Sequence, residues 1–365
     1  MKPEQSIYAR KSDGLFITPF NLSIDPMQQL MLIPFEKDPD RYYNLFEIQK
    51  ACPGNGEARL LVIAYKNDGT ADVYYQKNYP LASQSYILNN ASFIETNFNG
   101  IQFEVNLNNL KVVVSFKDKY GRDIFLSVEE PGIEQKKPFT LLAPVGTISK
   151  NPQTLPVYYM YKMSFVKKNS SKIKILIDDV SHKPDDFQLP IDYSSNYFTR
   201  YSLDTFNADW NKSFQGTPSM LVPESNCLTD SGVLYELNNN REHFEIKRMS
   251  AQRDQHNILI EFSPPVPDLL CLKNNIFTEG EFSIISDKSA GHIKGNYQVK
   301  KEMDQVQIKI HPCGGWMPNE KRLIIKLMLK VVSVFKIWPK SYVWSAVIKN
   351  DKAGGLHMES KWERI

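Results

Sequence analysis

Residues 110–117 read Leu-Lys-Val-Val-Val-Ser-Phe-Lys, and this stretch decides the fold class. From Leu110 to Phe116 every second side chain is apolar, which predicts a strand with one buried face, because successive side chains point to opposite faces of a sheet. The same alternation recurs at 172–177 and 305–310. We therefore expect a mainly antiparallel β fold with few short helices.

Turn residues divide the region around this stretch, from about 57 to 130, into a predicted run of hairpins. Asp-Gly and Asn-Gly pairs supply the positive φ that tight turns require. The four predicted turns are Asn67-Asp68-Gly69, Asn99-Gly100, Asn108-Asn109 and Lys119-Tyr120-Gly121-Arg122.

The length of 365 residues exceeds the usual size of one hydrophobic core, so two domains are expected. Five prolines fall close together after this run of hairpins, and proline cannot donate a hydrogen bond to a neighbouring strand. They are Pro131, Pro138, Pro144, Pro152 and Pro156. We predict an antiparallel β domain at 1–135, a Pro-rich linker at 136–156, and a second antiparallel β domain at 157–365 with a long irregular insertion at about 178–240. Each domain is expected to be a barrel or a sandwich.

Two segments have helical features. Residues 26–32 form the best candidate, with Asp25 as the N-cap and Pro26 at the first helical position. The stretch 321–335 spaces its lysines by four, as a helix does, but Val331 begins a β-branched run that favours a strand. We predict a strand there, with a membrane-surface helix as the alternative.

The composition argues against several function classes. Lys and Arg total 44 against 41 for Asp and Glu, a net charge of +3 without a basic stripe, so nucleic-acid binding is not expected. No apolar run approaches the ~18 residues of a membrane span, and the first residues lack a signal-peptide core, which predicts a cytoplasmic protein. The four cysteines form no C-x-x-C pair, and the histidines lack metal-binding spacings. We expect no metal and no cofactor.

Reactive side chains gather between residues 178 and 210, where we place weak candidates for catalysis. A carboxylate desolvated beside aromatic rings can act as a proton donor. The alternative is that these are solvated turn residues. The candidates are Asp179, His182, Asp204 and Asp209.

Aromatic residues in two regions are candidates for the wall of a ligand pocket. Large flat side chains suit either such a wall or a protein core, and both interpretations stay open here. The candidates are Tyr197, Tyr201, Trp210, Trp338, Tyr342 and Trp344.

Two successive meanders joined by a Pro-rich link resemble the double-calycin proteins, the lipocalin-like group that includes the carotenoid hydratase (hydroxyneurosporene synthase) and AttH-like proteins. Residues 291–297, which open a hairpin, and Trp338 and Trp344 in late strands carry this resemblance. The amino-terminal Gly-x-Trp of true lipocalins is missing, and no catalytic residue of the family can be matched. The resemblance implies an apolar cavity for a lipid, a terpenoid or a similar molecule.

We therefore expect a protein that binds a small hydrophobic ligand in a barrel cavity. One alternative is an acid–base hydratase, isomerase or cyclase acting on a terpenoid or lipid-like substrate. Another is a β-sandwich that binds carbohydrate on an aromatic platform. The sequence decides neither between enzyme and binding protein nor on the oligomeric state.

Overall fold

The computed structural model describes residues 6–12, 14–25, 27–52, 56–81, 88, 91–106, 108–143, 152–155, 157–191, 193–223, 226–240, 242–253, 255–286, 289–332, 335, 337–350 and 355–365. Strands make up 63% of the chain and helix 4%, which confirms the expected mainly β class. Among the described residues, no helix has the length and hydrophobicity required to span a lipid bilayer.

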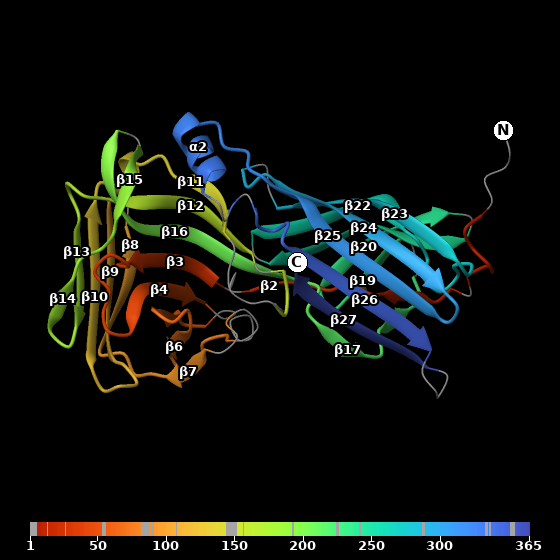
Figure 1. Cartoon of the computed structure of the whole chain (residues 1–365), viewed down its shortest axis with the longest axis horizontal. Helices are drawn as coiled ribbons and strands as arrows, with labels where there is room; N and C mark the ends of the chain where they lie inside the picture. Colours follow the sequence, from red (N-terminus) through yellow and green to blue (C-terminus); the bar gives the residue numbers. More distant parts are fainter. Residues whose placement is uncertain are drawn as a thin grey trace.

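Two packed sheets form one end of the elongated molecule, on the left in Figure 1. We call this end the sandwich lobe. The five-stranded sheet has the order β14 (Val180–His182), β13 (Lys172–Ile177), β10 (Asp123–Pro131), β9 (Asn109–Lys117) and β8 (Gly100–Val105). The branched sheet has the order β11 (Phe139–Ala143), β12 (Tyr158–Lys167), β16 (Ser194–Trp210), β3 (Met27–Pro34), β4 (Tyr43–Ala51), β5 (Arg59–Lys66), β6 (Ala71–Tyr75) and β7 (Ser92–Glu95), with β15 (Asp186–Ile191) and β2 (Leu22–Ile24) also paired to β16.

The alternation in β9 explains how these sheets pack. Leu110, Val112, Val114 and Phe116 are all buried, as predicted, in a core that they share with Ile48 and other residues of the branched sheet. One apolar face of each sheet is thereby removed from water.

A ten-stranded antiparallel sheet, the meander sheet, occupies the opposite end. Its order is β17 (Phe214–Gly216), β27 (Leu356–Arg364), β26 (Tyr342–Asn350), β25 (Gln305–Met317), β24 (His292–Glu302), β23 (Ile276–Ile285), β22 (His256–Val266), β21 (His243–Arg253), β20 (Val233–Asn240) and β19 (Cys227–Asp230). Within the described part of the chain β17 and β19 do not pair with each other, so the sheet is not a closed barrel.

The described residues of the amino-terminal segment (6–12 and 14–24) lie mainly against the meander sheet, and only β2, at the end of the segment, joins the branched sheet. Here β1 (Phe16–Thr18) pairs with β18 (Ser219–Leu221), and Tyr8 forms a β-bridge with Leu272. The Phe20 ring stacks on Phe262, with ring centroids 5.4 Å apart. The chain itself therefore covers apolar surface of the meander sheet.

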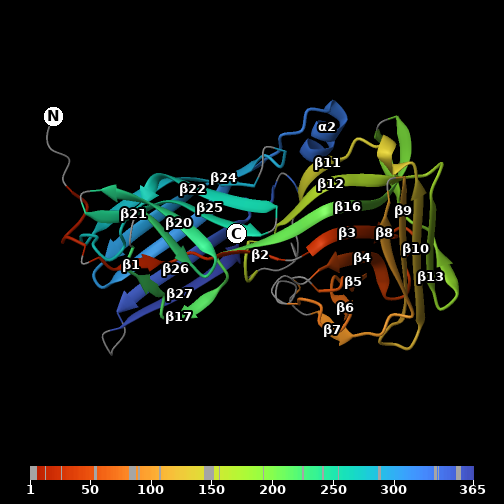
Figure 2. The same ribbon diagram turned by 180° about the vertical axis from the view of Figure 1, so that it is seen from behind.

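The 17-residue strand β16 connects the two ends of the molecule, as Figures 1 and 2 show. Its first part pairs with β12 and β3, and its last three residues pair with β2. At its end Trp210 packs against Phe282 and Trp362, with ring centroids 5.2 and 5.8 Å away. One hydrophobic core contains both Ile63 of β5 and Trp344 of β26, so apolar packing continues between the lobes.

Three of the four predicted hairpins are confirmed. They are β5–β6, β8–β9 and β9–β10, whose turns contain Gly69, Asn108 and Gly121. The hairpin predicted at Asn99-Gly100 is wrong, because β7 pairs with β6 in the branched sheet whereas β8 pairs with β9 in the five-stranded sheet. The chain between β7 and β8 therefore passes from the branched sheet to the five-stranded sheet.

Both predictions around helices are wrong. The expected helix at 26–32 is replaced by β3; Pro26 lies outside the described residues. The expected strand at 321–335 contains helix α2 (Leu323–Val331), preceded by Arg322 in an extended conformation. Ile325, Met328 and Leu329 are buried at helical spacing, and this contact decides the ambiguous pattern.

The predicted linker and insertion differ from the observed pairing. Residues 136–156 contain β11, while 144–151 and 156 lie outside the described residues. The branched sheet joins strands from both sides of that linker, and the division into domains there stays a prediction. The stretch 178–240, expected to be irregular, contains strands β14 to β20.

Candidate functional site

A cavity of about 130 Å³ lies at the edge of the branched sheet, partly open to solvent. We call it the edge pocket. A short 3-10 helix, η1 (Ile133–Gln135), leads into one wall, and β11, β12, β15 and β16 supply the rest. Its lining residues are Gln135, Lys136, Lys137, Phe139, Ser164, Phe165, Lys167, Ile191 and Asn196.

The lysines of the edge pocket differ in their pairing. Lys136 donates to the buried Glu130 carboxylate at 2.6 Å, so that pair is neutral. Lys137 is exposed and Lys167 half-buried, and no carboxylate among the described residues pairs with either ammonium group. The wall therefore has two uncompensated positive charges.

Aromatic rings form the apolar part of the edge pocket. Phe139 and Phe165 lie with ring centroids 6.1 Å apart, and Phe165 stacks on Phe187 at 4.3 Å. Arg322, the residue before α2, donates to the backbone oxygens of Lys137 and Pro138 at 2.5 and 3.3 Å. The start of α2 is thereby fixed at the pocket rim, and Figure 1 shows α2 next to β11.

A second polar group, the Glu47 cluster, is buried on the branched sheet. Glu47 accepts hydrogen bonds from Gln49 at 2.7 Å and from Tyr65 at 2.8 Å, one on each carboxylate oxygen. Gln49 also donates to Tyr158 and accepts from Tyr79. Burial raises the pKa of Glu47, although these hydrogen bonds act to lower it. Both oxygens are engaged within the protein, so the cluster stabilises the sheet and does not present a proton to a ligand.

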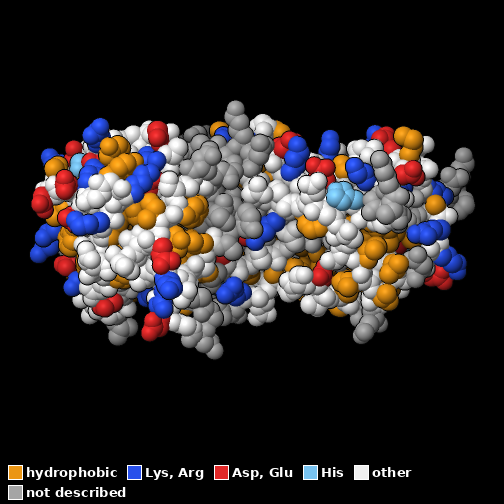
Figure 3. All heavy atoms as spheres, turned by 90° about the horizontal axis from the view of Figure 1, so that it is seen from below, with side chains coloured by type: hydrophobic (Ala, Val, Ile, Leu, Met, Phe, Trp, Pro, Cys, Tyr) orange, Lys and Arg blue, Asp and Glu red, His pale blue; other side chains and the backbone are white. Residues whose placement is uncertain are grey.

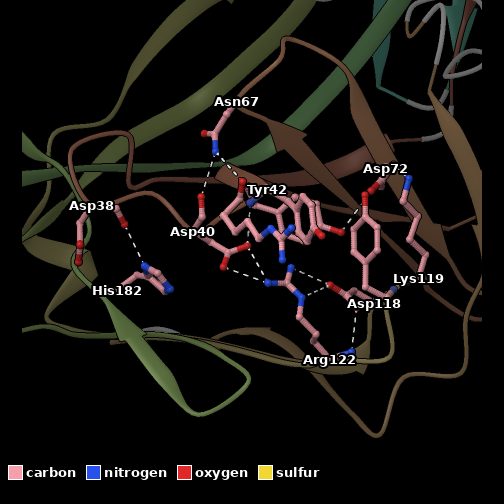
Figure 4. A network of polar contacts seen from close by, with 12 residues as sticks. Asp38, Asp40, Tyr42, Asn67, Asp72, Asp118, Lys119, Arg122 and His182 are labelled. Carbon is pink, nitrogen blue, oxygen red and sulfur yellow. Dashed lines mark hydrogen bonds and ion pairs between the residues drawn. The ribbon is translucent and has the colours of Figure 1, made fainter.

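A third group joins the two sheets of the sandwich lobe, and Figure 4 shows its centre at Arg122. The guanidinium donates to both oxygens of Asp40 at 3.0 and 2.9 Å, and its Nε donates to Asp118 at 2.9 Å. It also lies over the ring of Tyr42, 4.9 Å from the centroid. Burial acts to raise the pKa of Asp40, but backbone hydrogen bonds and Arg122 outweigh burial and lower it.

The fully buried Asp72 continues this network. Lys119 and Lys66 approach its carboxylate at 2.7 and 3.4 Å, and Tyr43 donates at 3.2 Å. Every charge has a partner of opposite sign, which is the arrangement that buried ion pairs need. We infer that the network has a structural role: it holds turns of the two sheets together.

The predicted catalytic candidates lie in two different sheets. Asp179 is exposed in the β13–β14 turn with φ +64°, and His182 on β14 donates from Nδ1 to the backbone oxygen of Asp38 at 2.9 Å. Both belong to the five-stranded side of the sandwich lobe. The turn geometry of Asp179 matches the solvated-turn alternative.

The other two candidates lie on β16 in the branched sheet. Asp204 pairs with His256 of β22 at 2.9 Å, and Asp209 is buried and pairs with Lys212 at 2.9 Å. Burial raises the pKa of Asp209, while Lys212 acts to lower it. No described contact joins this pair of aspartates to Asp179 or His182, so the structure does not assemble the four residues into one site.

The predicted ligand-lining aromatics are mostly core residues. Tyr201 and Tyr197 pack on the core of the sandwich lobe. The other four belong to the core that continues between the lobes, each with an exposed fraction of 2% or less; they are Trp210, Trp338, Tyr342 and Trp344. Their role in ligand binding stays a prediction.

The edge pocket was missed by sequence reasoning. Lys137 and Phe139 fall in the predicted linker, whereas Phe165 and Lys167 end a strand, and no spacing motif relates them. They meet only because β11 pairs with β12.

Surface charge gives no other site on the face seen in Figure 3, where acidic and basic side chains are interspersed over both lobes. Comparison of the chain with protein-family models, with curated proteins and with solved structures finds no match.

Proposed function

We propose that this protein binds a small amphipathic anion in the edge pocket. The anionic group contacts Lys137 and Lys167, and the apolar part lies against Phe139 and Phe165. The observation that supports this is the pair of unneutralised ammonium groups beside stacked rings in one cavity. Pockets for small molecules commonly combine an apolar wall with a few polar groups that fix orientation.

The volume limits the ligand. An apolar cavity of about 150 Å³ accepts benzene, so a cavity of about 130 Å³ holds one ring or a short chain. A carboxylate or phosphate on a short apolar body fits this size. Any longer part of the ligand lies outside the pocket, which is partly open to solvent.

The proposal retains the expected carrier of a small, mainly apolar molecule and changes the place of binding. A calycin-like barrel would hold its ligand in the interior, where Trp210 and Trp344 pack against the chain's own Phe282 and Phe20. The edge pocket offers a cavity, apolar walls and charge together.

Isothermal titration calorimetry with three probes tests the proposal: octanoate, 1-octanol and acetate. Octanoate is expected to bind at one site, and the other two at least about tenfold more weakly. A hydrogen bond to a charged group contributes roughly 1.5–3 kcal/mol, and about 1.4 kcal/mol corresponds to a factor of ten. Native mass spectrometry of freshly purified protein then identifies any co-purified natural ligand.

Matched variants locate the site. The double variant Lys137→Gln/Lys167→Gln is expected to bind octanoate no better than octanol, whereas Lys174→Gln, an exposed position on β13, leaves binding unchanged. Equal affinity for octanoate and octanol, or no binding of octanoate, contradicts the proposal.

A further inference from the structure

A buried cluster of His243, Asp268 and Cys271 lies at one end of the meander sheet, away from the edge pocket. We call it the His–Asp–Cys cluster; the exposed fractions of its members are 6%, 1% and 1%. His243 begins β21, and the other two follow the end of β22. Because β21 and β22 are antiparallel, with Ile246 opposite Val266, these two points of the chain meet.

The three side chains converge through unlike donor atoms. An imidazole nitrogen, a carboxylate oxygen and the Cys271 sulfur all lie within 4.8 Å of one another. His243 Nδ1 and Asp268 Oδ2 are 3.6 Å apart, too far for a hydrogen bond. Both atoms are buried without a hydrogen-bond partner among the described residues. Buried polar atoms are usually paired in folded proteins, and a cation placed between these two atoms would satisfy both.

The other groups around the cluster hold it in position. The backbone N–H of Leu270 donates to Asp268 Oδ1 at 3.1 Å, which leaves Oδ2 directed toward His243. The ring of Tyr8 stacks on the imidazole with centroids 3.8 Å apart. The Tyr8 hydroxyl donates to Glu245 at 2.6 Å and accepts from the backbone N–H of Asp268 at 3.4 Å.

The charge of the site is unbalanced. Glu245 accepts hydrogen bonds from Tyr8, Asn238 and Asn240, all neutral groups. Neither Glu245 nor Asp268 forms an ion pair with Lys or Arg in the described part of the chain. A buried carboxylate without a counter-charge is unfavourable, and a divalent cation would remove that cost.

We propose that His243, Asp268 and Cys271 bind one Zn²⁺ ion. Nitrogen, oxygen and thiolate sulfur are the donors that zinc accepts in proteins. In a tetrahedral site with metal–nitrogen and metal–oxygen distances of about 2.1 Å, two such ligand atoms lie roughly 3.4 Å apart. The observed 3.6 Å is close to that separation. A water molecule takes the fourth position, and the Cys271 thiol loses its proton to solvent on binding.

The location gives the ion a structural role. Ala9 N–H donates to the Cys271 oxygen at 2.7 Å, and Tyr8 bridges to Leu272, so the amino-terminal segment lies directly on the metal-binding turn. Zinc there fixes this segment and the β21–β22 end of the sheet together. All three protein ligands are buried, so the site is kept away from bulk solvent even though its fourth position belongs to a water molecule, and this burial favours a structural role.

The test uses the full chain without a histidine tag. The protein is stripped with a chelator, dialysed against Zn²⁺ and analysed by inductively coupled plasma mass spectrometry, with about one zinc per chain expected. Replacement of zinc by Co²⁺ is expected to produce a thiolate-to-cobalt charge-transfer band, which reports on Cys271 without any substitution.

Variants assign the ligands. Cys271→Ser and Asp268→Asn are expected to lower the zinc affinity about tenfold or more and to abolish or shift the cobalt band, while Cys227→Ser at an exposed position changes neither. Wild-type protein that retains no zinc, or that binds cobalt without the thiolate band, overturns the proposal. If a variant does not fold, the wild-type cobalt spectrum alone decides.

Discussion

The carboxyl group of Asp25 lies where the amino-terminal segment passes into β3. It accepts hydrogen bonds from the backbone N–H groups of Asn207 and Met27, at 3.0 and 3.2 Å. Burial nevertheless raises the pKa of Asp25 to about 7, and the charge of Asp209 adds to this effect. The folded protein therefore retains a proton on Asp25 at a pH where the unfolded chain has lost it.

This proton makes stability depend on pH with a definite sign. The favourable contribution is fully present below about pH 4 and is lost as the pH rises toward 7, at about 1.4 kcal/mol per pKa unit. We expect Asp25→Asn, which keeps the acceptor oxygen, to flatten the decline in unfolding free energy between pH 4 and 7. Urea unfolding at several pH values measures the free energy of unfolding of both proteins. Asp179→Asn, in an exposed turn, serves as control; equal slopes for Asp25→Asn and wild type would disprove the shift.

At the scale of elements, helix α2 shows two unlike faces. Met328 and Leu329 are 5% exposed, whereas Leu323 is 81% and Leu327 55% exposed. The helix is therefore attached to the protein by a narrow face, and an apolar stripe on its outer side meets water.

We expect neighbouring substitutions in α2 to have very different effects. Met328→Ala removes a buried side chain and is expected to lower the free energy of unfolding by about 2–3 kcal/mol. Leu327→Lys changes an exposed position and is expected to alter it by less than about 0.5 kcal/mol. Denaturant unfolding of both variants measures the difference. A large loss in Leu327→Lys would mean that another part of the chain covers this stripe.

Individual strands and helices also show how much of the fold could be predicted from the sequence. The β9–β10 hairpin followed from alternation and Gly121, because both signals are local. The residues of α2 fit a helix and a strand equally well, and only the burial of Ile325 and its neighbours decides. Tertiary contact, which no local pattern contains, overrode the β-branched preference.

The sites were harder to predict because their residues come from separate strands. Lys137 and Lys167 meet through the pairing of β11 with β12, which the predicted linker concealed. The residues of the His–Asp–Cys cluster meet because β21 and β22 form a hairpin whose open end brings His243 toward Asp268. Register, and not motif spacing, was the missing information.

At the scale of the whole molecule, β16 and the continuous core connect the two lobes. Trp210, 2% exposed, ends β16, and its carbonyl accepts hydrogen bonds from Thr154 at 2.9 Å and from the Trp362 indole at 3.2 Å. Loss of packing at this residue is therefore transmitted to strands of both lobes.

We expect the protein to unfold in one cooperative transition, and Trp210→Ala to lower the midpoint of that transition as a whole. The expected loss is about 3–5 kcal/mol, as for other buried tryptophans. Differential scanning calorimetry measures it, with Phe277→Ala, at a position 54% exposed on β23, as the control. Two separate peaks would show that the lobes unfold independently.

The position of the amino-terminal segment has a consequence for biosynthesis. Tyr8 contacts Glu245, 237 residues later, and at 5–20 residues per second the ribosome needs on the order of 10–50 s to make the intervening chain. Phe20 lacks its ring partners Phe262 and Trp344 throughout that interval, so we expect chaperones to bind this segment while the chain is being made. Two chains emerging together could also exchange these segments, so newly made protein carries a risk of swapped dimers.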